Sequence, residues 1–293
     1  MGTDRGGARF DGTTWTTFND ENSGLPGSPI YAVVARNGAV WFATDGGITK
    51  YDGASWEVFN SANSALIAGK VLALAFDRQG NLWAGIQGMG YGLAHFDGAT
   101  WKVYTAVDMG FPCDGVAAVA IDSSDNVWFG MRTKGLARFD GSGWLYFGQN
   151  DSAEVLASPS SLIVDPTGQL IIGTKGTGAF TFRNLNEWGR FKPSPSGLLN
   201  FDASTLALDR AGNLWFAGGW SGNSLGVQRY DGTGWKHYNV ANSGLPEGNV
   251  NAVAFDSAGG VWFGTRAGIG VLRGGVASVP SSSGGSSTSA SSR

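Results

Sequence analysis

The chain has 293 residues, including 48 Gly and 12 Trp, and only 15% of its residues are charged. Its net charge of -3 excludes an overall basic field that would attract nucleic acid or an anionic membrane. A single cysteine, Cys113, excludes an internal disulfide, and no apolar run approaches the roughly 20 residues that span a bilayer, so direct membrane insertion is not expected.

The chain begins with a segment that resembles the middle of a repeat. Residues 2–12 (GTDRGGARFDG) align with residues 43–53 (ATDGGITKYDG), and residues 1–7 lack the apolar stretch of a signal peptide. Residues 14–18 predict a strand that has no first strand before it. The sequence is therefore expected to start inside a repeat, as part of a longer precursor.

From residue 30 onward the dominant signal is a tryptophan that recurs about every 44 residues within a W-[FA]-[AG] segment. The intervals are 42, 45, 43, 44 and 47 residues. A fixed period of this length is typical of solenoids, propellers and arrays, and it outweighs any local interpretation. The repeated positions are Trp41, Trp83, Trp128, Trp215 and Trp262, with Ile171 in a weaker copy.

The repeat unit is clearest in residues 71–104, which predict four strands joined by D-x-x-G and D-G turns. The first strand is an apolar run typical of burial on both faces, and the fourth alternates in polarity. In a propeller the first strand lines the central channel and the fourth forms the rim, so this gradient favours a propeller. The predicted strands are residues 71–76, 81–85, 92–96 and 100–104.

Six first strands are predicted, near residues 30–35, 71–76, 117–121, 161–164, 203–208 and 250–255. The last repeat, residues 249–274, has no predicted fourth strand, and pairing it with the N-terminal strand near residues 6–18 would close the ring and remove exposed sheet edges. We therefore predict one all-β, six-bladed β-propeller over residues 1–277, with four-stranded antiparallel blades. Either residues 7–10 or residues 270–272 could supply the third strand of the closing blade. Residues 278–293, rich in Ser and Gly, predict a flexible tail or linker.

These residues resemble the two-component regulator propeller repeat. The shared pattern is found at residues 251–265, 47–59, 22–26 and 242–246. It reads V-x-A-[VIL]-A-[FI]-D-x-x-G-[NG]-[LV]-W-F-G-T, followed by G-[LI]-x-[RK]-[FY]-D-G-x-x-W and then by N-S-G-L-P. The resemblance implies a bacterial extracytoplasmic sensor region, in a family for which oligosaccharide detection has been inferred. The chain differs from such sensors in its short array and in lacking a transmembrane helix, a kinase or a regulator region.

Two sets of aspartates recur once per repeat, and both are predicted to cap turns rather than to bind a metal. Their spacing spreads them around one face of a ring, too far apart to converge on one ion. His95, His237 and Cys113 have no metal-ligand or catalytic spacing, so no cofactor, metal or catalytic residue is predicted. The repeated tryptophans are likewise assigned to packing between sheets. The aspartates are Asp77, Asp122, Asp165, Asp209 and Asp256 in D-x-x-G, and Asp11, Asp52, Asp97, Asp140 and Asp231 in D-G.

The loops between second and third strands should surround the channel mouth together with the loops that link blades, and such loops commonly carry function. Those at residues 85–92 and 218–224 are enlarged, and their aromatic residues could stack on a sugar. Basic residues in the equivalent loops could form a cationic rim that pairs with carboxylate or sulfate. The alternative is that these are solvated loop tips. The predicted ligand-binding residues are Trp220, Tyr91, Met89, Arg132, Lys134, Lys175, Arg266 and Asp45.

The predicted function is a non-enzymatic binding or sensor module, periplasmic or extracellular and monomeric, that recognises a small polar ligand such as an oligosaccharide at the loop face. One alternative is a scaffold that binds a protein partner at the same face. Another is a propeller lyase or hydrolase, because streptogramin lyases contain a comparable G-x-[IL]-W-F strand. The lack of converging histidines and of a clustered acid–base pair weighs against an enzyme.

Overall fold

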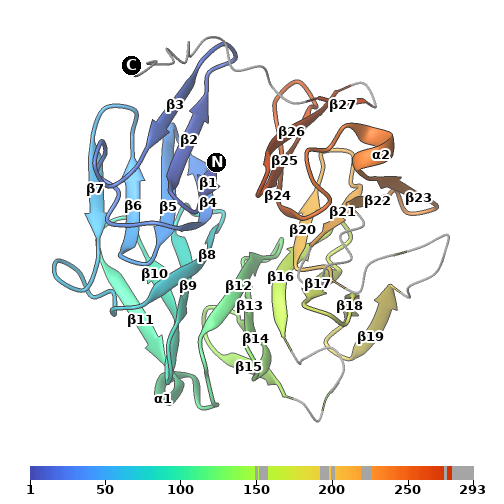
Figure 1. Cartoon of the computed structure of the whole chain (residues 1–293). Helices are drawn as coiled ribbons and strands as arrows, with labels where there is room; N and C mark the ends of the chain where they lie inside the picture. The colour runs from blue at the N-terminus through green and yellow to red at the C-terminus, as the bar shows by residue number, and fades with distance from the viewer. Residues whose placement is uncertain are drawn as a thin grey trace.

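The computed structural model describes residues 1–148, 151, 158–191, 198, 202–218 and 226–273, and the backbone of residues 276–278. Seven antiparallel sheets follow one another along the chain and are arranged around a common centre (Figure 1). In each sheet the strands pair in chain order, so each is a simple meander. The first three sheets consist of β1 (Gly2–Thr3), β2 (Gly6–Phe10) and β3 (Trp15–Phe18); β4 (Ile30–Arg36), β5 (Ala39–Thr44), β6 (Gly47–Tyr51) and β7 (Trp56–Phe59); and β8 (Lys70–Phe76), β9 (Leu82–Gln87), β10 (Tyr91–Phe96) and β11 (Trp101–Thr105).

The remaining four sheets repeat the same plan. Two single-turn helices, α1 (Ala106–Met109) and α2 (Val240–Ser243), lie in loops between sheets. Neither of these helices in the described part of the chain is long and apolar enough to cross a membrane. The four sheets consist of β12 (Val116–Ile121), β13 (Val127–Met131), β14 (Gly135–Phe139) and β15 (Trp144–Phe147); β16 (Pro159–Val164), β17 (Leu170–Thr174), β18 (Ala179–Arg183) and β19 (Glu187–Phe191); β20 (Thr205–Leu208), β21 (Leu214–Ala217), β22 (Val227–Tyr230) and β23 (Trp235–Tyr238); and β24 (Val250–Phe255), β25 (Val261–Thr265), β26 (Gly268–Arg273) and β27 (Val276–Ser278).

The propeller class and the antiparallel blades are confirmed, but the prediction of six blades is wrong, because the structure has seven sheets. The N-terminal segment forms a sheet of its own, and β27 supplies the fourth strand that the last repeat was expected to lack. Both predicted third strands of a closing blade are used, as β2 and β26. The prediction failed because β1 and β27 have two and three residues, too few to show a hydrophobic period.

The ring is not closed by a shared sheet, contrary to prediction. Trp15 lies in the first sheet and Trp262 in the last, and their ring centroids are 6.3 Å apart. Phe10 also packs against Trp262, at 5.8 Å. Side chains therefore join the first sheet to the last. Residues 279–293 lie outside the described residues, so the tail remains a prediction.

Four of the five D-x-x-G aspartates, all but Asp165, tie the turn after a first strand to the tryptophan of the next strand. Asp77 Oδ1 accepts hydrogen bonds from the N–H groups of Gly80 (2.9 Å) and Asn81 (2.8 Å). Its Oδ2 accepts from Asn81 Nδ2 (2.9 Å) and from Trp83 Nε1 (3.1 Å). The predicted capping role is confirmed, and the indole bond explains why Asp and Trp recur together. The same indole bond joins Trp128 to Asp122, Trp215 to Asp209 and Trp262 to Asp256.

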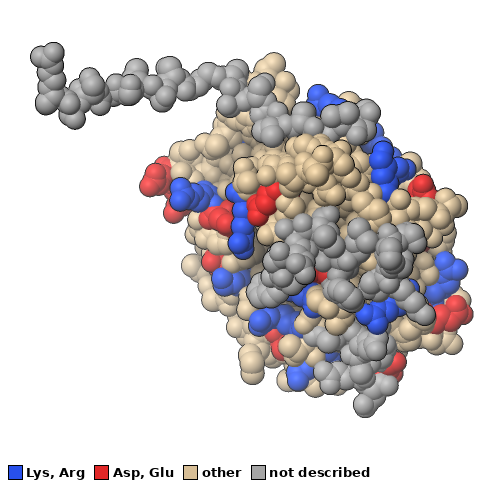
Figure 2. Space-filling model, turned by 45° about the vertical axis from the view of Figure 1, so that its right-hand side comes forward, with Lys and Arg blue, Asp and Glu red and all other residues tan. Residues whose placement is uncertain are grey.

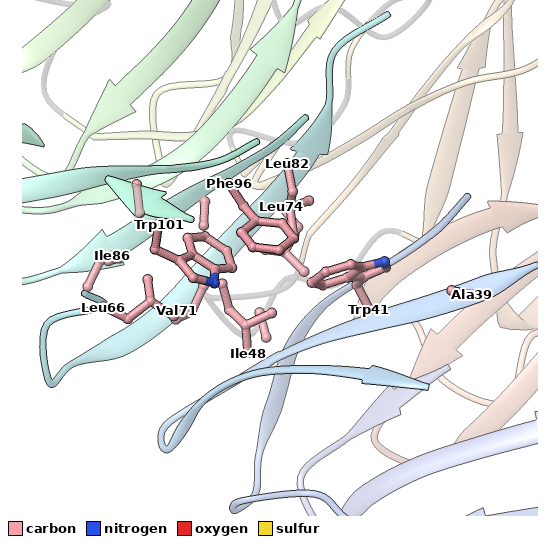
Figure 3. Packing of buried hydrophobic residues seen from close by; sticks show 13 residues of the cluster. Ala39, Trp41, Ile48, Leu66, Val71, Leu74, Leu82, Ile86, Phe96 and Trp101 are labelled. Atoms are coloured by element: carbon pink, nitrogen blue, oxygen red, sulfur yellow. The ribbon is translucent and has the colours of Figure 1, made fainter. Parts of the chain in front are cut away.

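The repeated tryptophans pack between neighbouring sheets, as predicted. Trp41 lies against Phe59 of its own sheet, with ring centroids 5.7 Å apart. It also lies 5.7 Å from Phe96 of the next sheet (Figure 3). Trp101 completes this group, which we call an aromatic box. Because aromatic pairs contribute about 0.5–1.5 kcal/mol each beyond their buried area, such boxes hold each sheet to the next. Equivalent boxes surround Trp83 with Tyr104, Phe139 and Trp144, and Trp128 with Phe147, Phe182 and Trp188.

The D-G turns at the outer edge are also capped by aspartate, as predicted. Asp52 Oδ1 accepts from the N–H groups of Ser55 (2.7 Å) and Ala54 (2.9 Å), and its Oδ2 accepts from Ser55 Oγ (2.7 Å). Bonds from the backbone N–H groups, foremost that of the residue three positions on, lower the pKa of Asp52, Asp140 and Asp231 to about 2.

This capping predicts acid sensitivity. Because these carboxylates have a lower pKa in the folded than in the unfolded chain, their stabilisation is complete above pH of about 4 and is lost as the pH falls toward about 2. We expect the melting temperature to fall steadily over this range in a calorimetric series. Replacing all three by Asn should flatten the dependence. A melting temperature that stays constant from pH 4 to pH 2 would contradict the assignment.

Candidate functional site

A cavity of about 250 Å³ opens on the loop face, between the turn after β5 and the loop that links β7 to β8. Asp45 and Gly46 from the turn line one side, and Asn60, Ser61 and Gly69 from the loop line the other. Binding sites at loops held by a rigid frame of sheets are common, because the frame fixes the loop ends. This cavity contains one of the predicted ligand-binding residues, Asp45.

The loop wall of the cavity is held by its own polar side chains. The Asn60 N–H donates to Asn63 Oδ1 (3.0 Å), and the Ala62 N–H donates to Asn60 Oδ1 (2.9 Å). Ser64 Oγ donates to the Asn60 carbonyl (2.7 Å), and Leu66 is buried below. Local bonds of this kind fix a loop without secondary structure. The same arrangement occurs at residues 19–25 and 239–245, so it belongs to the repeat rather than to this cavity.

A polar cluster of Tyr31, Asp45 and Lys70 lies beside the cavity. Tyr31 Oη donates to Asp45 Oδ1 (2.7 Å), and Lys70 Nζ donates to Tyr31 Oη (2.9 Å). Lys70 Nζ also lies 3.2 Å from Asp45 Oδ1. The bonds to Tyr31 and then to Asp45 raise the pKa of Lys70, which keeps the ammonium charged. The cluster thus presents a carboxylate, an ammonium and a phenol in a fixed arrangement.

Sequence reasoning found Asp45 but missed Tyr31 and Lys70. The pairing joins β4 to β8 of the next sheet, across a separation of 39 residues, so no local motif records it. Comparison of the repeats with one another could nevertheless have identified Tyr31. At the position of Tyr31, the first strands β8, β12, β16 and β24 carry Leu72, Ala117, Ser160 and Asn251, none of which is aromatic. A bulky polar residue there departs from the pattern as clearly as an enlarged loop does.

The other predicted residues are spread over several turns of the loop face. Tyr91 is half-buried and packs against the apolar cluster between the second and third sheets, whereas Met89 is 87% exposed. Trp220 lies outside the described residues. The four basic residues of the predicted cationic rim lie in turns of three different sheets, and the rim remains a prediction. Its members are all exposed: Arg132 and Lys134 between β13 and β14, Lys175 between β17 and β18, and Arg266 between β25 and β26.

The two histidines and the cysteine occupy packed positions. His95, in β10, packs against Trp83 with ring centroids 4.3 Å apart, and burial lowers the pKa of His95. His237 lies in β23, where burial also lowers its pKa. Cys113 is buried, and burial raises the pKa of its thiol. Within the described ranges, no group of three or more His, Cys, Asp or Glu side chains could hold a metal ion. On the face shown in Figure 2, Lys and Arg side chains are scattered, several of them next to acidic ones.

Residues 244–267 match the family described as Two component regulator propeller. The chain carries a repeat of this family. The match spans β24, β25 and the turn that carries Arg266, which confirms the resemblance seen in the sequence. No curated protein matches the sequence.

Several solved structures share the fold. The extracellular domain of a putative one-component system from B. thetaiotaomicron has a TM-score of 0.72 at 20% identity, over 92% of this chain and 36% of that one. PorZ, a surface component of the type-IX secretion system of Porphyromonas gingivalis, has a TM-score of 0.69 at 19% identity, over 89% and 42%. A catalytically inactive histidine-to-alanine variant of virginiamycin B lyase from Staphylococcus aureus has a TM-score of 0.64 at 14% identity, over 85% and 83%. The chain thus spans less than half the length of the first two proteins, and at these identities the likeness concerns the fold alone.

Proposed function

We propose that the chain is a non-enzymatic, ligand-binding propeller of the sensor type, and that the cavity beside Tyr31, Asp45 and Lys70 takes a small hydroxyl-rich ligand such as an oligosaccharide. The observation that carries the proposal is the fixed polar cluster next to a cavity on the loop face. Because the cluster is already ordered by its own bonds, ligand binding has little side-chain entropy to overcome.

The chemistry of the cavity favours a neutral polar ligand over a strongly charged one. The Asp45 carboxylate accepts hydrogen bonds from hydroxyl groups, and the Lys70 ammonium donates to hydroxyl and carbonyl oxygens. Their opposite charges lie 3.2 Å apart and largely offset each other. Asn60 and Ser61 line the opposite wall and add further polar groups. A sugar offers several hydroxyls that match such a mixed set of donors and acceptors.

The setting of the domain also supports a sensor outside the cytoplasm. The chain carries a two-component regulator propeller repeat, and one structure with the same fold is an extracellular domain of a signalling protein. We propose a periplasmic or extracellular location and a monomeric ring, with neither nucleic acid nor the membrane as a direct partner.

Two observations separate this proposal from a lyase. The virginiamycin B lyase of the same fold is described as inactive when one histidine is replaced. In this chain, His95 packs against Trp83 within a sheet and His237 lies in the outer strand β23, and neither lines the loop-face cavity. No histidine among the described residues therefore lines this cavity.

A protein contact is the second candidate, and one observation favours it. Met89 and Val107 are 87% and 89% exposed. Their segments are joined by hydrogen bonds from the Ala106 N–H to the Gly90 carbonyl (2.7 Å) and from the Gly90 N–H to the Cys113 carbonyl (3.0 Å). Exposed large apolar side chains on two joined segments favour a protein contact there.

The sugar proposal predicts that binding of the ligand requires Asp45. In a calorimetric screen of neutral and acidic oligosaccharides, we expect one or more neutral sugars to raise the melting temperature. Asp45→Ala and Lys70→Ala should each weaken binding about tenfold or more, since a hydrogen bond to a charged group contributes about 1.5–3 kcal/mol.

The matched control is the exposed pair Lys50–Glu57 on the outer strands, 3.4 Å apart. Glu57→Ala removes a similar ion-pair partner without touching the cavity and should leave binding unchanged. If no sugar raises the melting temperature, and Met89→Ser abolishes the binding of a protein partner, a protein-contact function replaces sugar binding as the proposal.

A further inference from the structure

The linker loop at the loop-face cavity departs from the other linkers at one position. Four linkers between sheets are described throughout, and each runs from the end of one sheet to the first buried residue of the next. They align without gaps at residues 19–30, 60–71, 105–116 and 239–250. Where the linker at the cavity has Ile67, the other three have proline, at Pro26, Pro112 and Pro246. Ile67 lines the cavity, so this exception adds a branched apolar side chain there.

Apolar side chains form a large part of the cavity lining. Leu66 and Val71 are almost wholly buried, and Ile67 is half-buried. A sugar that carries only hydroxyl groups would place polar atoms against this surface, where they lose hydrogen bonds to water without replacement. A ligand with a small apolar group would instead remove apolar surface from water. The cavity therefore favours a sugar that carries such a group.

Groups of opposite hydrogen-bonding character line the two sides of the cavity. On one side, Tyr31 and Lys70 contact Asp45 Oδ1, while Asp45 Oδ2 accepts from no described residue. On the other side, Asn60 Oδ1 accepts from the Ala62 N–H (2.9 Å), while Asn60 Nδ2 has no acceptor among the described residues. The ligand therefore meets a carboxylate acceptor on one side and an amide donor on the other.

A trans amide has the shape that fits between two such sides. Its N–H and C=O lie in one plane and point in opposite directions. The N–H can therefore donate to Asp45 Oδ2 while the carbonyl oxygen accepts from Asn60 Nδ2. When the amide is an acetamido group, its methyl group supplies the small apolar part that contacts Ile67 and Leu66.

We propose that the ligand is an N-acetylated sugar and that its acetamido group occupies this cavity. The inference rests on the proposed function and names the class of sugar. Lys70 Nζ, which lies 3.2 Å from Asp45 Oδ1, donates to the hydroxyl group on the ring carbon next to the acetamido group. An acetylated amine without a sugar ring lacks this hydroxyl, so the polar cluster favours the sugar.

Isothermal titration calorimetry with the unmodified protein tests the inference. Di-N-acetylchitobiose, cellobiose and chitobiose have the same linkage and differ only in the group at C2, which is acetamido, hydroxyl and amino, respectively. We expect the acetylated disaccharide to bind at least about tenfold more tightly than the other two, because a pocket that fits an apolar group discriminates by about 10–200-fold.

Two substitutions assign the contacts. Asn60→Asp keeps the acceptor for the Ala62 N–H and replaces the Nδ2 donor by an oxygen, so it should weaken binding of the acetylated disaccharide about tenfold or more. Ile67→Ser should weaken it about fivefold, by removing the contact with the methyl group. The matched control, Asn19→Asp, makes the same change in the linker before the second sheet, where Asn19 Oδ1 accepts from the Glu21 N–H (3.1 Å). It should leave binding unchanged.

The outcomes separate this inference from the sugar proposal. Equal affinity for the acetylated disaccharide and cellobiose would overturn the inference and leave the sugar proposal in place. Equal affinity for the amino disaccharide would mean that an amine is recognised and not its acetyl group, which would also overturn it. If none of the three binds up to about 10 mM, the inference fails, and the calorimetric screen of other oligosaccharides then decides the sugar proposal by itself.

Discussion

Trp83→Ala is expected to lower the free energy of unfolding by about 3–5 kcal/mol, the largest effect of any substitution considered for this chain. Trp83 is 5% exposed, and its indole packs on His95 in its own sheet and on Phe139 in the next. The substitution removes this contact between sheets and leaves the Asp77 carboxylate without its indole donor. Denaturation by urea, followed by circular dichroism, measures the loss.

Two controls separate the contributions to this effect. Trp83→Phe retains an aromatic ring and removes the N–H group, so it should cost clearly less than Trp83→Ala. Ile171 holds the equivalent position in the fifth sheet and is fully buried, but it has no donor for Asp165. Ile171→Ala should therefore cost about 2–5 kcal/mol through packing alone. Equal losses for Trp83→Phe and Trp83→Ala would mean that the indole bond, and not ring packing, carries the effect.

Asp77→Ala is expected to lower the free energy of unfolding by about 3 kcal/mol, because it leaves one buried and three partly buried hydrogen bonds without their acceptor. Asp77 is 5% exposed and accepts four hydrogen bonds, from Gly80, Asn81 and Trp83. The same urea measurement applies. Asp165→Ala is the matched control, since Asp165 accepts from Thr167 and Gln169 without an indole, and it should cost less.

A double-mutant cycle with Asp77→Ala and Trp83→Phe isolates the bond between the carboxylate and the indole. We expect a coupling of about 1 kcal/mol or more, as residues in direct contact show. Additive losses would instead indicate that the two residues stabilise the fold separately.

The sequence predicts the strands correctly where each strand has enough residues to show the hydrophobic pattern of the repeat. The first strand at residues 250–255 is observed with the predicted bounds, and the tryptophan and aspartate positions have the predicted structural roles. The number of blades was wrong because Gly2–Thr3 and Val276–Ser278 are too short to carry a pattern. The predicted sheet shared by Trp15 and Trp262 is wrong, because their rings lie 6.3 Å apart but in different sheets. Whether they share a sheet depends on backbone pairing, which residue types alone do not determine.

The candidate site was less accessible to prediction. Asp45 was identified from its loop, but Tyr31 and Lys70 reach it from first strands of two neighbouring sheets. Such contacts depend on how closely neighbouring sheets approach each other, and the period of a sequence repeat does not specify that distance. Tyr91, chosen as a stacking platform, is half-buried in packing between sheets, and its role in binding remains a prediction.

The way the ring is built also bears on how the chain reaches its native state. Since every described sheet is made of consecutive strands, the strand pairing within the described sheets is local in sequence. The side chains of Phe10, Trp15 and Trp262 pack across the two ends. Proteins rich in local contacts fold faster than those that must close long loops first. Each sheet can therefore form as it leaves the ribosome, and no strand has to wait unpaired, exposed to aggregation, for the last residues to be synthesised.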